Sequence, residues 1–97
     1  MIIVHDTFVC KPGNASKLAK LFKEVMAGNK ELVRIMTDLT GDYNRVIMVT
    51  QYDNLSAYEQ SFQKYMQDTE EMRTMKEKMK GYHEMYHKGS REIYQVW

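Results

Sequence analysis

The chain is poor in the residues that mark secreted and extracellular proteins. Its 97 residues include one cysteine, Cys10, and one proline, Pro12. A single cysteine cannot form an intramolecular disulfide, and the first residues lack the basic start and apolar run of a signal peptide. Both observations indicate a cytoplasmic protein.

The chain also lacks an excess of one charge and a long apolar run. Lys and Arg number 14 against 13 Asp and Glu, which gives a formal net charge of +1. This balance provides no field that would attract phosphate backbones or anionic lipid. Nowhere are there about 18 consecutive apolar residues, the length that a membrane span requires. We therefore expect neither nucleic acid nor a membrane as a partner.

What the chain does contain is a clear alternation of strand-like and helix-like segments within one domain, residues 1–97. β-branched and aromatic residues gather in four runs, while apolar residues recur at spacings of three and four in the segments between them. The pattern predicts strands over 1–10, 32–39, 45–52 and 90–97, and helices over 15–26, 55–67 and 68–86. A chain this short buries only about two-thirds of its unfolded surface, so help from a partner subunit is expected.

Residues at the helix ends support these assignments. Asn14 is a plausible N-cap for the first helix, and Ser56 with Glu59 matches a capping box at the start of the second. Gly81 interrupts the last helical stretch. Because a glycine inside a helix costs about 1 kcal/mol relative to alanine, we expect a bend or a break there.

The order strand, helix, strand, strand, helix, strand is typical of an α+β, ferredoxin-like fold, in which helices cover one face of an antiparallel sheet. Apolar residues nevertheless occur at both parities of the first strand: Ile2 and Val4 at even positions, Ile3 and Val9 at odd positions. Which parity faces the helices stays open. The face left uncovered is too apolar for a stable monomer, so the pattern predicts a homodimer in which two sheets form a barrel.

Three short segments carry a family resemblance that covers nearly the whole chain. They are the turn Lys11-Pro12-Gly13, the connector Thr40-Gly41-Asp42-Tyr43, and Gly89 to Tyr94 at the start of the last strand. With them the chain resembles the dimeric α/β-barrel superfamily, which includes antibiotic-biosynthesis-monooxygenase-like and NIPSNAP-like domains. The resemblance implies a ferredoxin-like fold, a homodimer and, in many members, a small pocket between the sheet and the helices.

One string matches a metal motif. His83-Glu84-Met85-Tyr86-His87 reads H-E-x-x-H, in which two histidines one helical turn apart bind zinc in peptidases. A catalytic zinc needs a third protein ligand, and the extended motif would place it at position 93, where the chain has Ile93. His83 and His87 are therefore a weak candidate pair for a metal, and we expect no cofactor.

The candidate ligand pocket is predicted from four residues that the fold could bring together: Asp6, Tyr52, His83 and Tyr86. Asp6 and His83 are the candidate catalytic bases. In some cofactor-free monooxygenases of the superfamily an asparagine lies near the position of Asp6, with a tryptophan and a histidine on the second helical segment. This chain has its only tryptophan at position 97 and no histidine between 55 and 67.

Three functions stay open at this stage. The first is binding of a small apolar or aromatic molecule between sheet and helices. The second is a cofactor-independent monooxygenase or isomerase, and the third is a purely structural or partner-binding dimer. The methionines at helical spacing, Met72, Met75 and Met79, favour core packing over ligand contact.

Overall fold

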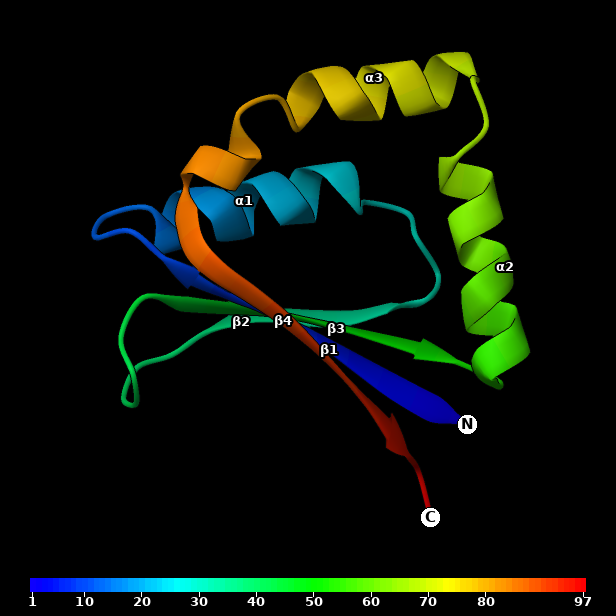
Figure 1. Ribbon diagram of the computed structural model, residues 1–97, viewed down its shortest axis with the longest axis horizontal. Helices are drawn as coiled ribbons and strands as arrows, with labels where there is room; N and C mark the ends of the chain where they lie inside the picture. The colour runs from blue at the N-terminus through cyan, green and yellow to red at the C-terminus, as the bar shows by residue number, and fades with distance from the viewer.

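The computed structural model describes all 97 residues and shows one four-stranded antiparallel sheet with the strand order β2-β3-β1-β4. This arrangement confirms the α+β, ferredoxin-like fold (Figure 1). None of the helices combines the length and the apolar character that a bilayer span requires. The elements in chain order are β1 (Ile2–Cys10), α1 (Ala15–Val25), β2 (Leu32–Thr37), β3 (Arg45–Tyr52), α2 (Leu55–Tyr65), α3 (Glu70–Lys78), the short 3-10 helix η1 (Tyr82–Glu84) and β4 (Tyr86–Gln95).

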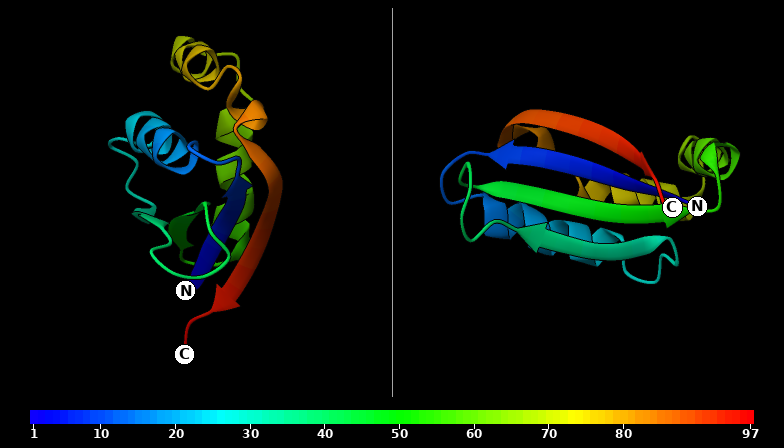
Figure 2. Two further views of the ribbon diagram at one scale, coloured as in Figure 1. Left: turned by 90° about the vertical axis from the view of Figure 1, so that its left-hand side faces the viewer. Right: turned by 90° about the horizontal axis from the view of Figure 1, so that it is seen from below.

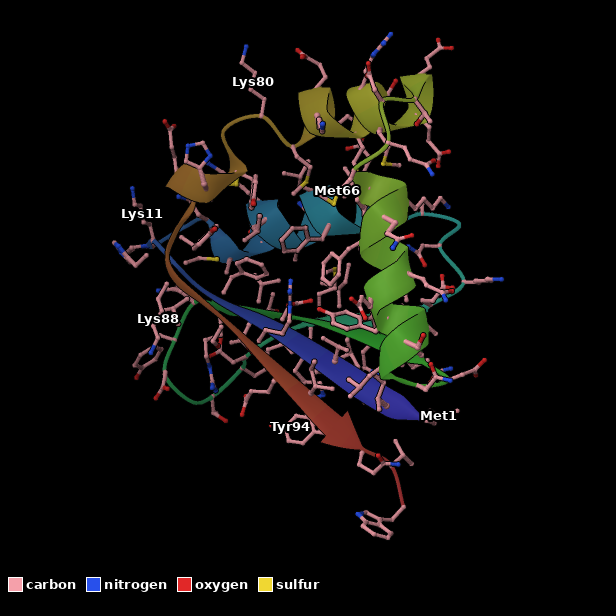
Figure 3. The ribbon with its side chains drawn as sticks, turned by 45° about the vertical axis from the view of Figure 1, so that its right-hand side comes forward. Met1, Lys11, Met66, Lys80, Lys88 and Tyr94 are labelled. Atoms are coloured by element: carbon pink, nitrogen blue, oxygen red, sulfur yellow. The ribbon has the colours of Figure 1, made fainter.

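The helices lie on one side of the sheet: the right-hand view of Figure 2 shows α1 and α3 behind the four strands, and Figure 1 shows α2 standing at the end of the sheet on that same side. The even residues of β1 face the helices, because Phe8 and Cys10 pack with residues of α1. The odd residues, among them His5, face the opposite way. Figure 3 shows Tyr94 of β4 projecting on this uncovered side, where its ring meets that of His5 edge-on at 5.2 Å between centroids.

The core forms between α1 and the middle of the sheet. α1 buries Leu18 and Phe22 against Cys10 of β1 and Val46 of β3. The helix is strongly amphipathic, since its lysines occupy the opposite face. Asn14 holds the N-cap position but makes no side-chain capping bond. The first half of the chain thus supplies most of the buried apolar surface.

The second half departs from the predicted boundaries. α2 is capped by Asn54, whose side-chain oxygen accepts from the Ala57 N–H at 2.8 Å, so the predicted cap at Ser56 lies inside the helix. The last helical stretch breaks as expected at Gly81, which adopts a left-handed φ of 81°. α3 therefore ends at Lys78, and the chain continues through the short turn η1.

The last strand begins four residues earlier than predicted, at Tyr86 rather than Ser90, and ends at Gln95. Pairing with β1 holds this extra length: Val9 faces Lys88, and Cys10 faces Tyr86 after a register shift. The H-E-x-x-H string is consequently divided, because His83 lies in η1 and His87 in β4. The two histidines are therefore not presented one turn apart on a regular helix, which is the spacing that the zinc motif requires.

Candidate functional site

A cleft of about 520 Å³ lies where α1, α2 and α3 meet over the end of β3. This volume is within the range of small-molecule sites. The cleft is bounded by the end of α1, the loop that follows it, one face of α2 and the first turns of α3. Its lining residues are Val25, Ala27, Gly28, Asn29, Lys30, Glu31, Tyr52, Ala57, Gln60, Ser61, Lys64, Tyr65, Glu71, Met72 and Met75.

A hydrogen bond between distant parts of the chain fixes one wall of the cleft. The side-chain Nδ2 of Asn29 donates to the Tyr65 hydroxyl at 3.2 Å, and the side-chain Oδ1 of Asn29 accepts from the backbone N–H of Glu31 at 2.9 Å. Burial, the neighbouring Tyr52 and the carboxylates of Glu31 and Glu71 raise the pKa of Tyr65. Tyr65 therefore stays a neutral phenol near neutral pH, with its polar tip in a wall of mixed polar and apolar residues.

Beside the cleft, Asp6 and Arg91 form an ion pair between β1 and β4. The two residues are direct cross-strand neighbours, and Arg91 Nε donates to Asp6 Oδ1 at 2.5 Å. The Asp6 side chain is only 11% exposed, whereas that of Arg91 is 49% exposed. Burial opposes the charge on Arg91, but its hydrogen bond to Asp6 and the charge of that carboxylate raise the pKa of Arg91. Arg91 thus stays charged and supplies the partner that a buried carboxylate needs.

Three aromatic rings line up next to this ion pair. Tyr52 of β3 meets Tyr58 of α2 edge-on at 5.0 Å, and Tyr58 meets Phe62 at 4.9 Å. The Arg91 guanidinium carbon lies 5.9 Å from the Tyr58 ring centroid and 5.4 Å from that of Phe62. These are cation–π distances. Because Tyr52 also lines the cleft, it joins the aromatic row to the cleft wall.

The Tyr58 hydroxyl stands out within this row because it is buried and has no hydrogen-bond partner. Burial raises the pKa of Tyr58, and the charge of Asp6 adds to the rise while that of Arg91 opposes it. It is the one buried side-chain polar group of the protein without a partner. A group of this kind is rare in native proteins, so its lack of a protein partner calls for an explanation.

The structure separates the four predicted pocket residues into two places. Asp6 and Tyr52 both lie beside Tyr58 and Arg91, and Tyr52 alone lines the cleft. Tyr86 instead packs edge-on against Phe8 at 4.9 Å, in the core under η1.

His83 is exposed on η1 and touches the ring of Tyr82. It does not line the cleft. No group of three or more His, Cys, Asp or Glu side chains is placed to hold a metal ion, so His83 and His87 have no third ligand near them.

Sequence reasoning missed Arg91 and Tyr58. Arg91 is separated from Asp6 by 85 residues, and only the register of β1 against β4 shows that the two side chains meet. Tyr58 lies within the helix predicted over 55–67, yet nothing in its spacing indicates a hydroxyl without a partner. The signal that could have identified the pair is a basic residue in the last strand at the position opposite an acidic residue of the first strand.

Comparison with known families agrees with this fold. A family model described as NIPSNAP matches residues 6–91. The chain belongs to the NIPSNAP family. A search of curated proteins finds no match.

Solved structures of this family are similar over nearly their whole length. An uncharacterised NIPSNAP domain protein from Burkholderia xenovorans aligns with a TM-score of 0.79 and 12% identity, covering 100% of this chain and 95% of that protein. A NIPSNAP family protein from Agrobacterium tumefaciens aligns with a TM-score of 0.78 and 14% identity, covering 99% and 85%.

A more distant likeness connects the fold to another group. A candidate antibiotic biosynthesis monooxygenase from Nitrosomonas europaea aligns with a TM-score of 0.63 and 11% identity, covering 99% of this chain and 98% of that protein. The resemblance to NIPSNAP-like domains is confirmed by the family match, and the likeness to the monooxygenase group is one of fold. At these identities the likeness shows the fold, and the chemistry must come from the site.

Proposed function

We propose that this NIPSNAP protein binds a small, uncharged aromatic or apolar molecule in the cleft over the end of β3. The observation that carries the proposal is the cleft itself, about 520 Å³ in volume, at the junction of three helices. Its apolar wall contains Met72 and Met75 of α3 and Val25 of α1. Thioethers adapt to ligands of different shapes, and the tyrosines add flat surfaces with polar tips.

The cleft offers hydrogen bonds but no net charge. Its charged lining residues are two lysines, Lys30 and Lys64, and two glutamates, Glu31 and Glu71. None of the four takes part in an ion pair within the protein. An uncharged ligand meets no unbalanced field there, which is why we infer a neutral molecule.

The test uses an uncharged aromatic probe, 2-acetonaphthone, in a fluorescence titration. Ala57 lines the cleft from α2, so Ala57→Phe should fill it and weaken binding at least about tenfold, roughly the effect of losing one good buried contact surface. The control Ser56→Phe adds the same ring to the neighbouring position, which is exposed and outside the cleft. Equal binding by both variants would refute the cleft as the site. Failure of the unmodified protein to bind would favour a purely structural or partner-binding role.

We also propose that the protein is a homodimer joined through the uncovered faces of its two sheets. That face carries apolar side chains on three neighbouring strands, Ile3 of β1, Ile47 of β3 and Tyr94 of β4, and no helix covers it (Figure 2). Exposed apolar surfaces of this kind mark protein interfaces.

The one cysteine of the protein, Cys10, is a buried free thiol. We propose the reducing cytoplasm as the compartment of the protein.

Light scattering at micromolar concentration tests the dimer. Ile47→Lys places a charge in the middle of the uncovered face and should yield a monomer, because a buried unpaired charge is strongly unfavourable. Gln63→Lys adds the same charge to an exposed position of α2 and should leave the dimer intact. A monomeric unmodified protein would refute this part of the proposal.

A second candidate function is a cofactor-independent oxygenase or isomerase. The buried carboxylate of Asp6 beside an aromatic row favours it, together with the fold that the chain shares with candidate monooxygenases. Asp6 would act as the base. Steady oxygen uptake with a panel of hydroquinones, abolished by Asp6→Asn, would support this function. No uptake above the rate without protein would exclude it for those substrates.

A further inference from the structure

Arg91 has hydrogen-bonding capacity that the protein does not use. Its Nε is taken by Asp6, but no side chain or backbone group of the protein accepts from its two Nη atoms. The Arg91 side chain is 49% exposed, and its guanidinium lies within cation–π distance of the rings of Tyr58 and Phe62. A planar fork of donors is therefore held in one orientation, with one edge occupied and one free.

The buried Tyr58 hydroxyl adds a second unused donor next to that fork. Its ring is in cation–π contact with Arg91, so the two unused groups border the same small region. Around this region the surface is apolar and partly open: Phe62 is 38% exposed and Ile93 is 43% exposed. Unfilled donors beside exposed flat and branched apolar side chains suit a ligand with an acceptor group on a flat body.

We propose that Arg91 and Tyr58 form a second binding site, on the α2 face next to the cleft, which takes the carboxylate of a flat aromatic acid. The two Nη atoms of Arg91 match the two carboxylate oxygens. The Tyr58 hydroxyl, which is closed off in the free protein, donates a further bond once the ligand displaces the Phe62 ring packed against Tyr58. The aromatic body of the acid packs against Phe62 and Ile93. The site shares no residue with the cleft and does not depend on a ligand being bound there.

A carboxylate fits this site better than a neutral acceptor does. Each hydrogen bond between Arg and a carboxylate is about twice as strong as one between neutral groups, and the pair forms two such bonds in parallel. Asp6 already balances the charge of Arg91, but it does so from the Nε edge. An acid at the free edge lies closer to the guanidinium than to the Asp6 carboxylate, so attraction exceeds repulsion.

The test compares two probes with the same ring system, 2-naphthoate and 2-acetonaphthone, by calorimetry. The unmodified protein should bind the acid more tightly than the ketone. Tyr58→Phe and Arg91→Lys should each reduce this preference at least about fivefold, the effect of losing one charge-assisted hydrogen bond. Tyr58→Phe should at the same time leave the melting temperature unchanged or raise it, because it removes a buried hydroxyl without a partner.

The cleft-filling variant Ala57→Phe separates this site from the cleft. It should retain the preference for 2-naphthoate while losing 2-acetonaphthone. If Ala57→Phe removes the preference and the Tyr58 and Arg91 variants keep it, the acid is bound by the cleft lysines and the second site is refuted. A protein that binds both probes equally, or binds neither, also refutes the second site. The proposal of binding in the cleft is refuted by a different result, namely unchanged binding of 2-acetonaphthone by Ala57→Phe.

Discussion

The two helical halves of the molecule are packed very differently. α1 buries Leu18, which is 0% exposed, and Phe22, which is 4% exposed, over the centre of the sheet. α2 has no buried residue, and α3 buries only Met72. α3 packs mainly beside α1, and α2 stands at the end of β3.

The difference shows which half determines the fold and which half is free for function. A helix with its apolar stripe fully buried contributes directly to the free energy of unfolding. A helix held by capping bonds, edge-on aromatic contacts and an ion pair is more weakly attached and leaves space beside it. Both the cleft and the aromatic row lie on this weakly attached half.

The largest expected effect comes from the first half. Leu18→Ala should lower the free energy of unfolding by about 3 kcal/mol, because it leaves a cavity in a fully buried position. Leu55→Ala, the same change at a 60% exposed position of α2, should alter it by less than about 0.5 kcal/mol. Urea denaturation measures both values. Similar losses for the two variants would contradict the asymmetry.

The ion pair should carry the next largest effect. Arg91→Met leaves the Asp6 carboxylate nearly buried and without a partner, and should cost about 1–2 kcal/mol. Arg73 bonds Asp68 through two nitrogens, at 2.7 and 2.9 Å, but both side chains are exposed. Arg73→Met should therefore have the smaller effect in urea denaturation despite its better geometry. The opposite order would show that geometry outweighs burial here.

Helix capping gives a smaller and more local effect. The Thr69 side chain accepts from the Met72 N–H at 3.2 Å at the start of α3. Thr69→Ala should destabilise α3 by about 1 kcal/mol, which corresponds to roughly fivefold faster hydrogen exchange of its amides. Thr74→Ala, at an exposed position inside the same helix, is the matched control and should not accelerate exchange. Unchanged exchange in both variants would mean that packing rather than the cap holds α3.

The sequence determined the packed half of the molecule more closely than the weakly attached half. β3 begins and ends at the predicted residues, Arg45 and Tyr52, because its apolar alternation is bounded by turn residues on both sides. In the weakly attached half, the break at Gly81 was also predicted, since glycine adopts a positive φ without strain. The predicted start of β4, Ser90, was wrong because His87 and Lys88 have no strand preference of their own. Pairing with β1 decides their conformation.

The site followed the same rule. Asp6 and Tyr52 were identified from the sequence, and the structure places both near Tyr58. Their partner Arg91 was not identified, because the contact depends on a register between the first and last strands that local patterns do not encode. The cleft could not be predicted either, because it arises where α1, α2 and α3 meet over the end of β3.

The smallest effect, and the most specific, concerns the hairpin that joins β2 and β3. Asp38 accepts from the Arg45 backbone N–H at 3.0 Å and from Arg45 Nε at 3.1 Å. These interactions hold the pKa of Asp38 below its usual value, chiefly through the backbone bond. A carboxyl whose pKa is lower in the folded than in the unfolded state stabilises the protein above its unfolded pKa, about 4, and loses that contribution as the pH falls through the folded value. Asp38→Asn should therefore lose less stability between pH 5 and pH 2 than the unmodified protein in thermal melts at each pH. Asp42→Asn changes a nearby carboxyl that is 86% exposed, and its stability should vary with pH as that of the unmodified protein does. The same pH dependence in the unmodified protein and both variants would show that the hairpin contributes nothing to acid unfolding.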